Sequence, residues 1–143
     1  MVAGPQSQGR LKPQRLRKWL RRTALLTPLA FAPALCAEPL PAAAKDVIAQ
    51  VHSAASTSDY PKLRALMIEE FSWSFGGDRS ADQAIAEWRK RPRYLRRLAE
   101  ATKSKCAYQD SYVECPANAG TSFRAGFTKI GQRWKMAYFV AGD

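Results

Sequence analysis

Apolar residues recur at helical spacing after residue 44 and at alternating spacing after residue 105, which predicts helices followed by strands. A first helix with one apolar face is expected over residues 45–58. Asp59 and Pro61 are typical of a new helix start, because Asp accepts hydrogen bonds from the first turn and proline needs no partner there. The residues expected on the two apolar faces are Val47, Ile48, Val51 and Ala55, then Leu63, Leu66, Met67 and Phe71.

The pattern then changes twice before residue 105. Residues 71–75 alternate aromatic side chains with serine, as a half-buried strand does. Ser80 and Gln83 form a capping box, so a third helix is expected to begin near Ala81. Pro92 must kink or split that helix because it lacks the N–H group that a helix interior needs.

Four strands are expected next, arranged as two hairpins. A turn at Asp110-Ser111 pairs Tyr108 with Val113 and sets apolar and polar residues on opposite faces. A four-residue loop is the alternative, because Asp-Ser is a weaker turn signal than Asp-Gly. A second turn at Gly131-Gln132 suits type II′, which has glycine first. The partners expected along the second hairpin are Phe127 with Met136, Ala125 with Tyr138 and Phe123 with Val140 on the core side, and Thr128 with Lys135, Gly126 with Ala137 and Arg124 with Phe139 on the reverse side.

The first hairpin places Cys106 directly opposite Cys115. Their Cα atoms should approach to about 4.5 Å, at the short end of the range that a disulfide spans. Redox-active pairs usually read C-x-x-C, and zinc needs three or four ligands. A structural disulfide is therefore expected, with a redox pair, a metal site and free thiols as the alternatives.

The first 37 residues contain seven Lys or Arg and no acidic residue. The apolar run from Thr23 to Ala37 that follows is shorter than the roughly 20 residues that cross a bilayer. This pattern predicts an export signal over residues 1–37, cleaved after Ala34, Cys36 or Ala44, and a periplasmic or secreted protein. Residues 38–44 are then a Pro/Ala-rich linker and residues 45–143 one α+β domain; an uncleaved anchor is the alternative.

The net charge of +11 would suggest a nucleic acid partner, but seven of the basic residues belong to the expected export signal. Residues 38–143 hold 16 basic and 12 acidic residues. Nucleic-acid binding would need several aromatic residues interleaved with the basic run, and Tyr94 stands there alone, so no nucleic acid partner is expected. That run is either a solvated helix face or a docking surface for lipid headgroups, an envelope polymer or an acidic protein patch. Its members are Arg89, Lys90, Arg91, Arg93, Arg96 and Arg97.

Catalytic motifs are mostly missing from the sequence. His52 is the one histidine, and neither a G-x-S-x-G elbow nor a phosphate-binding loop occurs. Asp78 and Asp82 flank a helix start and are expected to be loop and first-turn acids favoured by the helix dipole, with metal binding as the alternative. No cofactor, metal or catalytic residue is therefore expected.

The early helices resemble the opening of the NTF2-like (SnoaL-like) superfamily, and the later strands closing on Gly131 and Trp134 fit its order over residues 45–140. The resemblance rests on Asp59, Tyr60, Leu63, Leu66, Phe71 and Trp73. It implies two or three N-terminal helices packed on a curved four-stranded antiparallel sheet, a cone with an apolar pocket. Members include isomerases, dehydratases and non-catalytic binding domains. The Asp–Tyr pair of the steroid isomerases matches no motif here.

The function expected from these observations is a non-catalytic ligand-binding or interaction module of the periplasm or cell envelope. Its partner would be a small apolar ligand or an anionic envelope component. The alternatives are a pocket enzyme of isomerase or dehydratase type and electrostatic docking through the basic run. The aromatic residues that would line such a pocket, or would simply form the core, are Tyr60, Trp73, Trp88, Tyr108, Phe127 and Tyr138.

Overall fold

The computed structural model describes residues 38–74, 76, 79–120 and 122–142. The expected export signal, Phe75 and Asp78 lie outside this part of the chain. Four helices and five strands within it confirm the α+β class, and no helix there is long and apolar enough to span a membrane. The elements are α1 (Ala42–Ser56), α2 (Tyr60–Leu66), β1 (Met67–Ser72), α3 (Ala81–Lys90), α4 (Arg93–Lys103), β2 (Ala107–Gln109), β3 (Tyr112–Cys115), β4 (Phe123–Ile130) and β5 (Arg133–Ala141).

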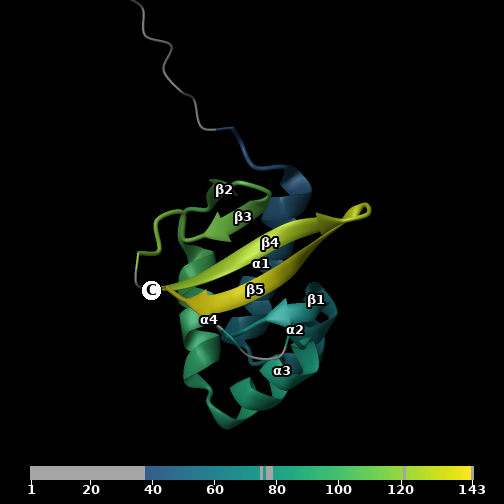
Figure 1. The fold of residues 1–143 in the computed structure, drawn as a ribbon, viewed down its shortest axis with the longest axis vertical. Coiled ribbons are helices and arrows are strands. Elements are labelled where there is room, and N and C mark those ends of the chain that lie inside the picture. The colour runs from purple at the N-terminus through teal and green to yellow at the C-terminus, as the bar shows by residue number, and fades with distance from the viewer. Residues whose placement is uncertain (1–37, 75, 77–78, 121, 143) are drawn as a thin grey trace, which may run out of the picture. The chain divides into compact units, whose positions relative to one another are not determined.

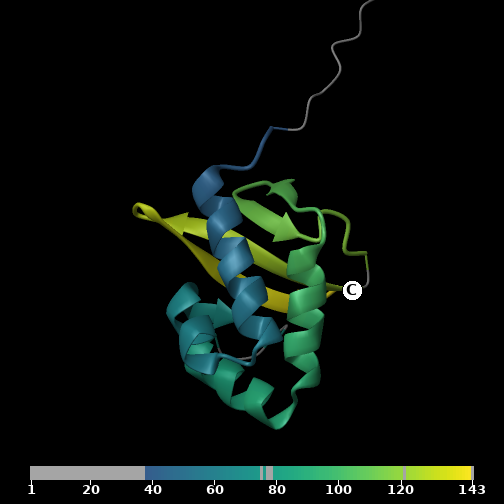
Figure 2. The same cartoon turned by 180° about the vertical axis from the view of Figure 1, so that it is seen from behind.

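The five strands form one mixed sheet in the order β1-β5-β4-β3-β2. Strand β1 runs parallel to β5, and the other neighbours are antiparallel. Figure 1 shows the sheet in front, and Figure 2, from behind, shows α1 and α4 lying across its other face. The helices therefore pack against one face of the sheet. The opposite face, which no described helix covers, is called the open face.

Strand β1 corrects two expectations: the strand predicted over residues 71–75 spans Met67–Ser72, and the sheet is five-stranded and mixed instead of four-stranded and antiparallel. Helix α2 ends at Leu66, and Met67 and Phe71 belong to β1 instead of continuing the helix. Both side chains are fully buried, as expected. Residues four apart share a face in a helix and also in a strand, so their spacing alone cannot distinguish the two structures. Met67 pairs with Met136 on β5, which shows that this segment is a strand.

The helix boundaries follow the capping residues. The Asp59 carboxylate accepts from the Lys62 N–H at 3.1 Å, and the Ser80 hydroxyl accepts from the Gln83 N–H at 3.3 Å. Pro92 splits the third expected helix into α3 and α4. Helix α1 begins at Ala42, earlier than expected, so it includes the end of the Pro/Ala-rich segment.

The first hairpin has the expected register, with Tyr108 opposite Val113. The second is correct near its turn, where Phe127 faces Met136, and wrong beyond it. A β-bulge between Gly126 and Phe127 leaves one β5 residue, Ala137, without a partner. The observed partners are Gly126 with Tyr138, Ala125 with Phe139, Arg124 with Val140 and Phe123 with Ala141. The bulge therefore turns Phe139 into the core and Tyr138 to the open face.

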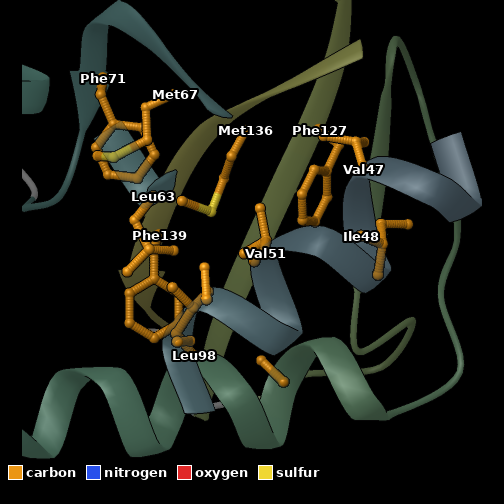
Figure 3. Packing of buried hydrophobic residues seen from close by; sticks show 14 of the residues in the cluster. Val47, Ile48, Val51, Leu63, Met67, Phe71, Leu98, Phe127, Met136 and Phe139 are labelled. Carbon is orange, nitrogen blue, oxygen red and sulfur yellow. The ribbon is translucent and has the colours of Figure 1, made fainter. Parts of the chain in front are cut away.

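The core fills the space between the helices and the sheet (Figure 3). Trp88 is 1% exposed, and its ring packs edge-to-face with those of Phe71 and Phe139, each at 5.8 Å between ring centroids. The His52 side chain extends from α1 to α4, where its Nδ1 atom is 3.0 Å from the carbonyl oxygen of Ala99. That hydrogen bond gives the single histidine a structural partner.

Candidate functional site

A groove of about 750 Å³ runs over the open face of the sheet. Its walls come from β1 and the chain that follows it, from the β2–β3 hairpin, and from β4 and β5. This volume falls within the range of small-molecule sites, which is about 300–1,000 Å³. The side chains that define its floor and sides include Ile68, Ser72, Tyr112, Glu114, Arg124 and Tyr138.

Strand alternation and the bulge together place these side chains. Glu114 and Tyr112 lie on one face of β3, because side chains two apart point to the same side of a strand. The bulge brings Tyr138 to that face, opposite Gly126 on β4. A Cβ atom added to Gly126 would overlap the Tyr138 ring, so glycine leaves the space in which the ring lies.

At the floor of the groove, a buried carboxylate accepts a hydrogen bond from a phenol. The Tyr138 hydroxyl donates to the Glu114 Oε2 atom at 2.5 Å, and Glu114 is 9% exposed. The Tyr112 ring packs edge-on against Tyr138, 5.4 Å away between centroids. Burial and the Glu114 hydrogen bond raise the pKa of Tyr138, since both favour the neutral phenol. Tyr138 therefore stays protonated and acts as a hydrogen-bond donor.

We expect Tyr138→Phe to flatten the loss of stability at alkaline pH. A phenol whose pKa is raised by folding contributes stability that is complete below its ordinary pKa of about 10 and is lost as the pH rises through the folded value. The wild-type free energy of unfolding should fall above about pH 10, by at most about 1.4 kcal/mol per pH unit from this group. Urea unfolding across that range measures the slope for each protein.

The matched control for that experiment is Tyr108→Phe. Tyr108 belongs to the same sheet but is 37% exposed and pairs with Val113 on the other face of the hairpin. Its variant should keep the wild-type slope. Equal slopes in wild type and Tyr138→Phe would show that the phenol on the open face does not titrate as described.

The remaining groove residues give it a mixed character. Arg79 and Arg124 supply positive charge, and Glu70 and Asp110 supply negative charge near the rim. Ile68 and Val140 add apolar surface. Within the described ranges, no three His, Cys, Asp or Glu side chains converge as metal ligands would. The arrangement suits a small molecule that has both an apolar body and polar groups.

The six aromatic residues expected to line a pocket do not gather in one place. Trp88 and Phe127 are buried in the core, and Trp73 is half-buried against it. Tyr60 lies beneath the Arg89 guanidinium, 5.2 Å from its ring centroid. Of the six, Tyr138 lines the groove.

Sequence reasoning missed Glu114 as a site residue. It lies on the hairpin face predicted to be mostly polar, where a charged residue is ordinary and does not by itself indicate a site. The signal that could have identified it is its position in β3, which β2 and β4 flank on either side. A carboxylate at the middle of a sheet loses more water than one at an edge and needs a partner.

Cys106 and Cys115 are joined by a disulfide, with their Cα atoms 4.4 Å apart. The bridge connects the chain entering β2 to the end of β3. Strand β2 has only three residues and pairs with β3 alone. The disulfide therefore fastens the edge of the sheet that carries one wall of the groove.

The basic run is spread over the end of α3 and the start of α4. Arg91 donates to Glu87 at 2.8 Å, and Arg97 pairs with Glu100 at 3.1 Å. Lys90 is 3.9 Å from Glu87, a weaker contact at the surface. Arg93, Arg96 and Pro92 line a surface hollow together with Arg91. The run is thus partly neutralised by its own helices.

Asp82 has a structural partner. The Arg64 guanidinium lies 2.6 Å from an Asp82 oxygen and 2.5 Å from a Glu69 oxygen. The hydrogen bond from Arg64 lowers the pKa of Asp82. The expected first-turn acid of α3 thus also ties that helix to α2 and β1.

Comparisons with known proteins concern the fold alone. No protein-family model matches the chain, and no curated protein matches it. Among solved structures, a designed NTF2-like protein of the Rd1NTF2 series matches at 16% sequence identity and a TM-score of 0.41. The match covers 69% of this chain and 96% of that one.

Proposed function

We propose that the protein is an exported ligand-binding module and that the groove on the open face is its binding site. The observation that carries this proposal is the Glu114–Tyr138 pair at the floor of a cavity large enough for a small molecule. Buried polar groups at the base of an otherwise mixed cavity fix the orientation of a ligand. Ile68 and Val140 would contact its apolar part.

The same pair favours a second candidate function, a pocket enzyme. A carboxylate beside a tyrosine is the type of titratable pair that active sites use. Tyr138 donates its one O–H to Glu114, so this hydrogen bond would have to break before the phenol could donate to a substrate. The raised pKa of Tyr138 also disfavours the phenolate that a base would need. Binding without turnover separates the first candidate from the second.

The binding proposal predicts saturable uptake of an amphipathic anion. The probe is 8-anilinonaphthalene-1-sulfonate, whose rings match the apolar side of the groove and whose sulfonate matches Arg79 and Arg124. Its fluorescence titration should show one site per chain at a pH where the protein is folded. Ser72→Trp, which fills the groove from β1, should weaken the probe's affinity by about tenfold or more.

The control variant is Ser53→Trp, which adds the same side chain at an exposed position on α1. It should bind the probe as the wild type does. Equal affinity in both tryptophan variants would place the probe elsewhere and contradict the proposed site. Equal unfolding midpoints for the two variants verify that neither has lost its fold.

Export enters the proposal through the leader pattern and the disulfide, since disulfides persist in oxidising compartments. Cleavage after Ala34 or Cys36 would leave α1 complete. Cleavage after Ala44 would cut α1 in its first turn and separate Ala44, which is fully buried, from its helix. We therefore favour the two earlier points. The mass of the protein recovered from an exporting host tests this choice.

A further inference from the structure

The excess positive charge of residues 38–143 is concentrated at the corner where α3 meets α4. Six basic residues lie between Arg89 and Arg97, and the two acids paired with them are Glu87 and Glu100. The rest of residues 38–143 contains ten basic and ten acidic residues, so it is neutral overall. The net charge of residues 38–143, which is 16 − 12 = +4, therefore equals the net charge of this corner, 6 − 2 = +4.

The corner has a defined shape because Pro92 separates the two helices. A hollow of about 390 Å³ opens there, lined by Arg91, Pro92, Arg93 and Arg96. A second hollow of about 430 Å³ continues from Pro92 and Arg96 toward the end of α1. Figure 1 and Figure 2 both show this corner at the far end of α4 from the β2–β3 hairpin.

Two arginines of the hollow have no carboxylate partner among the described residues. These are Arg93 and Arg96, whereas Arg91 shares Glu87 and its side chain remains 54% exposed. The Arg93 guanidinium lies over the Tyr94 ring, 5.5 Å from its centroid, which restrains its position. Guanidinium groups held in this way suit phosphate oxygens, which they bind through two parallel hydrogen bonds.

We propose that Arg91, Arg93 and Arg96, the arginine corner, dock the protein on a membrane surface that carries anionic phospholipids. Both hollows open outward at a corner of the domain, so their arginine side chains can contact a flat layer of phosphate groups together. They do not enclose a single ion. The large apolar residues exposed in the described ranges, Tyr108, Tyr112 and Ile130, belong to the two hairpins. The contact would therefore be electrostatic, without insertion into the bilayer.

Co-sedimentation with vesicles tests the proposal. The probe is a vesicle of phosphatidylcholine with about one-third phosphatidylglycerol, at low salt. Removing one charge near such a surface lowers partitioning about fivefold, so Arg91→Gln/Arg93→Gln/Arg96→Gln should lower it about 100-fold. Raising the salt concentration should weaken wild-type binding in the same direction.

The matched control removes three exposed charges elsewhere, at the start of α1 and at the β4–β5 turn, as Lys45→Gln/Lys129→Gln/Arg133→Gln. It should change partitioning by no more than about threefold, since these residues lie away from the corner. Both triple variants carry the same N-terminus, so any contribution of the leader is equal. Unfolding midpoints confirm that both remain folded.

Three outcomes would overturn the proposal. Equal losses in both triple variants would mean that net charge alone drives binding. Equal binding to vesicles of pure phosphatidylcholine would exclude recognition of anionic headgroups. Binding of soluble polyphosphate without binding of vesicles would assign the arginine corner to a free polyanion and not to a membrane surface.

Discussion

Gly126→Ala is expected to lower the free energy of unfolding by about 3 kcal/mol, a large share of the stability of a small domain. The new methyl group would occupy the space of the Tyr138 ring. That ring cannot move freely, because it is bonded to Glu114 and packs against Tyr112. Displacing it adds overpacking to the cost of leaving a buried carboxylate without its donor. Urea unfolding at neutral pH measures the loss.

The two causes can be separated by repeating the substitution in other backgrounds. In Tyr138→Phe the ring remains but its hydrogen bond is gone, so Gly126→Ala should cost only the overpacking part, about 1–3 kcal/mol. In Tyr138→Ala both causes are absent and the cost should fall below about 1 kcal/mol. A loss of equal size in all three backgrounds would mean that the ring is not the reason for glycine at this position.

This dependence on Gly126 could not be seen in the sequence, because it arises from a bulge. Alternation correctly predicted both hairpins and the pairing of Phe127 with Met136. A strand pattern of period two contains no mark for an extra residue, and one extra residue exchanges the faces beyond it. Tyr138 and Phe139 are both aromatic, so the sequence is equally consistent with either residue facing the core. The open-face site depends on that exchange.

The helical half was more predictable for a physical reason. Caps act locally, so Asp59, Ser80 and Pro92 determine helix ends through bonds within a few residues. Strand β1 depends instead on a partner about 70 residues later in the chain, Met136 on β5. Local spacing contains no information about such a partner. The same limit applies to the groove, whose walls come from strands far apart in sequence.

Replacing both cysteines, as Cys106→Ala/Cys115→Ala, is expected to lower the free energy of unfolding by about 2.5–3 kcal/mol. The bridge closes a short loop, and the estimate is the chain entropy that it removes from the unfolded state. Alanine is chosen because Cys115 is fully buried and serine would place a hydroxyl there without a partner. Chemical denaturation with and without a reductant measures the change.

The reductant provides the control and links the disulfide to the site. Wild-type protein treated with dithiothreitol should lose about the same stability as the double variant, and the variant should be unaffected by it. The reduced protein should also bind the sulfonate probe more weakly, because Gln109, Asp110 and Tyr112 form the groove wall on the hairpin that the bridge fastens. Stability lost without any change in probe affinity would show that pairing with β3 alone holds this wall in place. A variant within about 0.5 kcal/mol of wild type would show that the short β2 edge needs no covalent fastening.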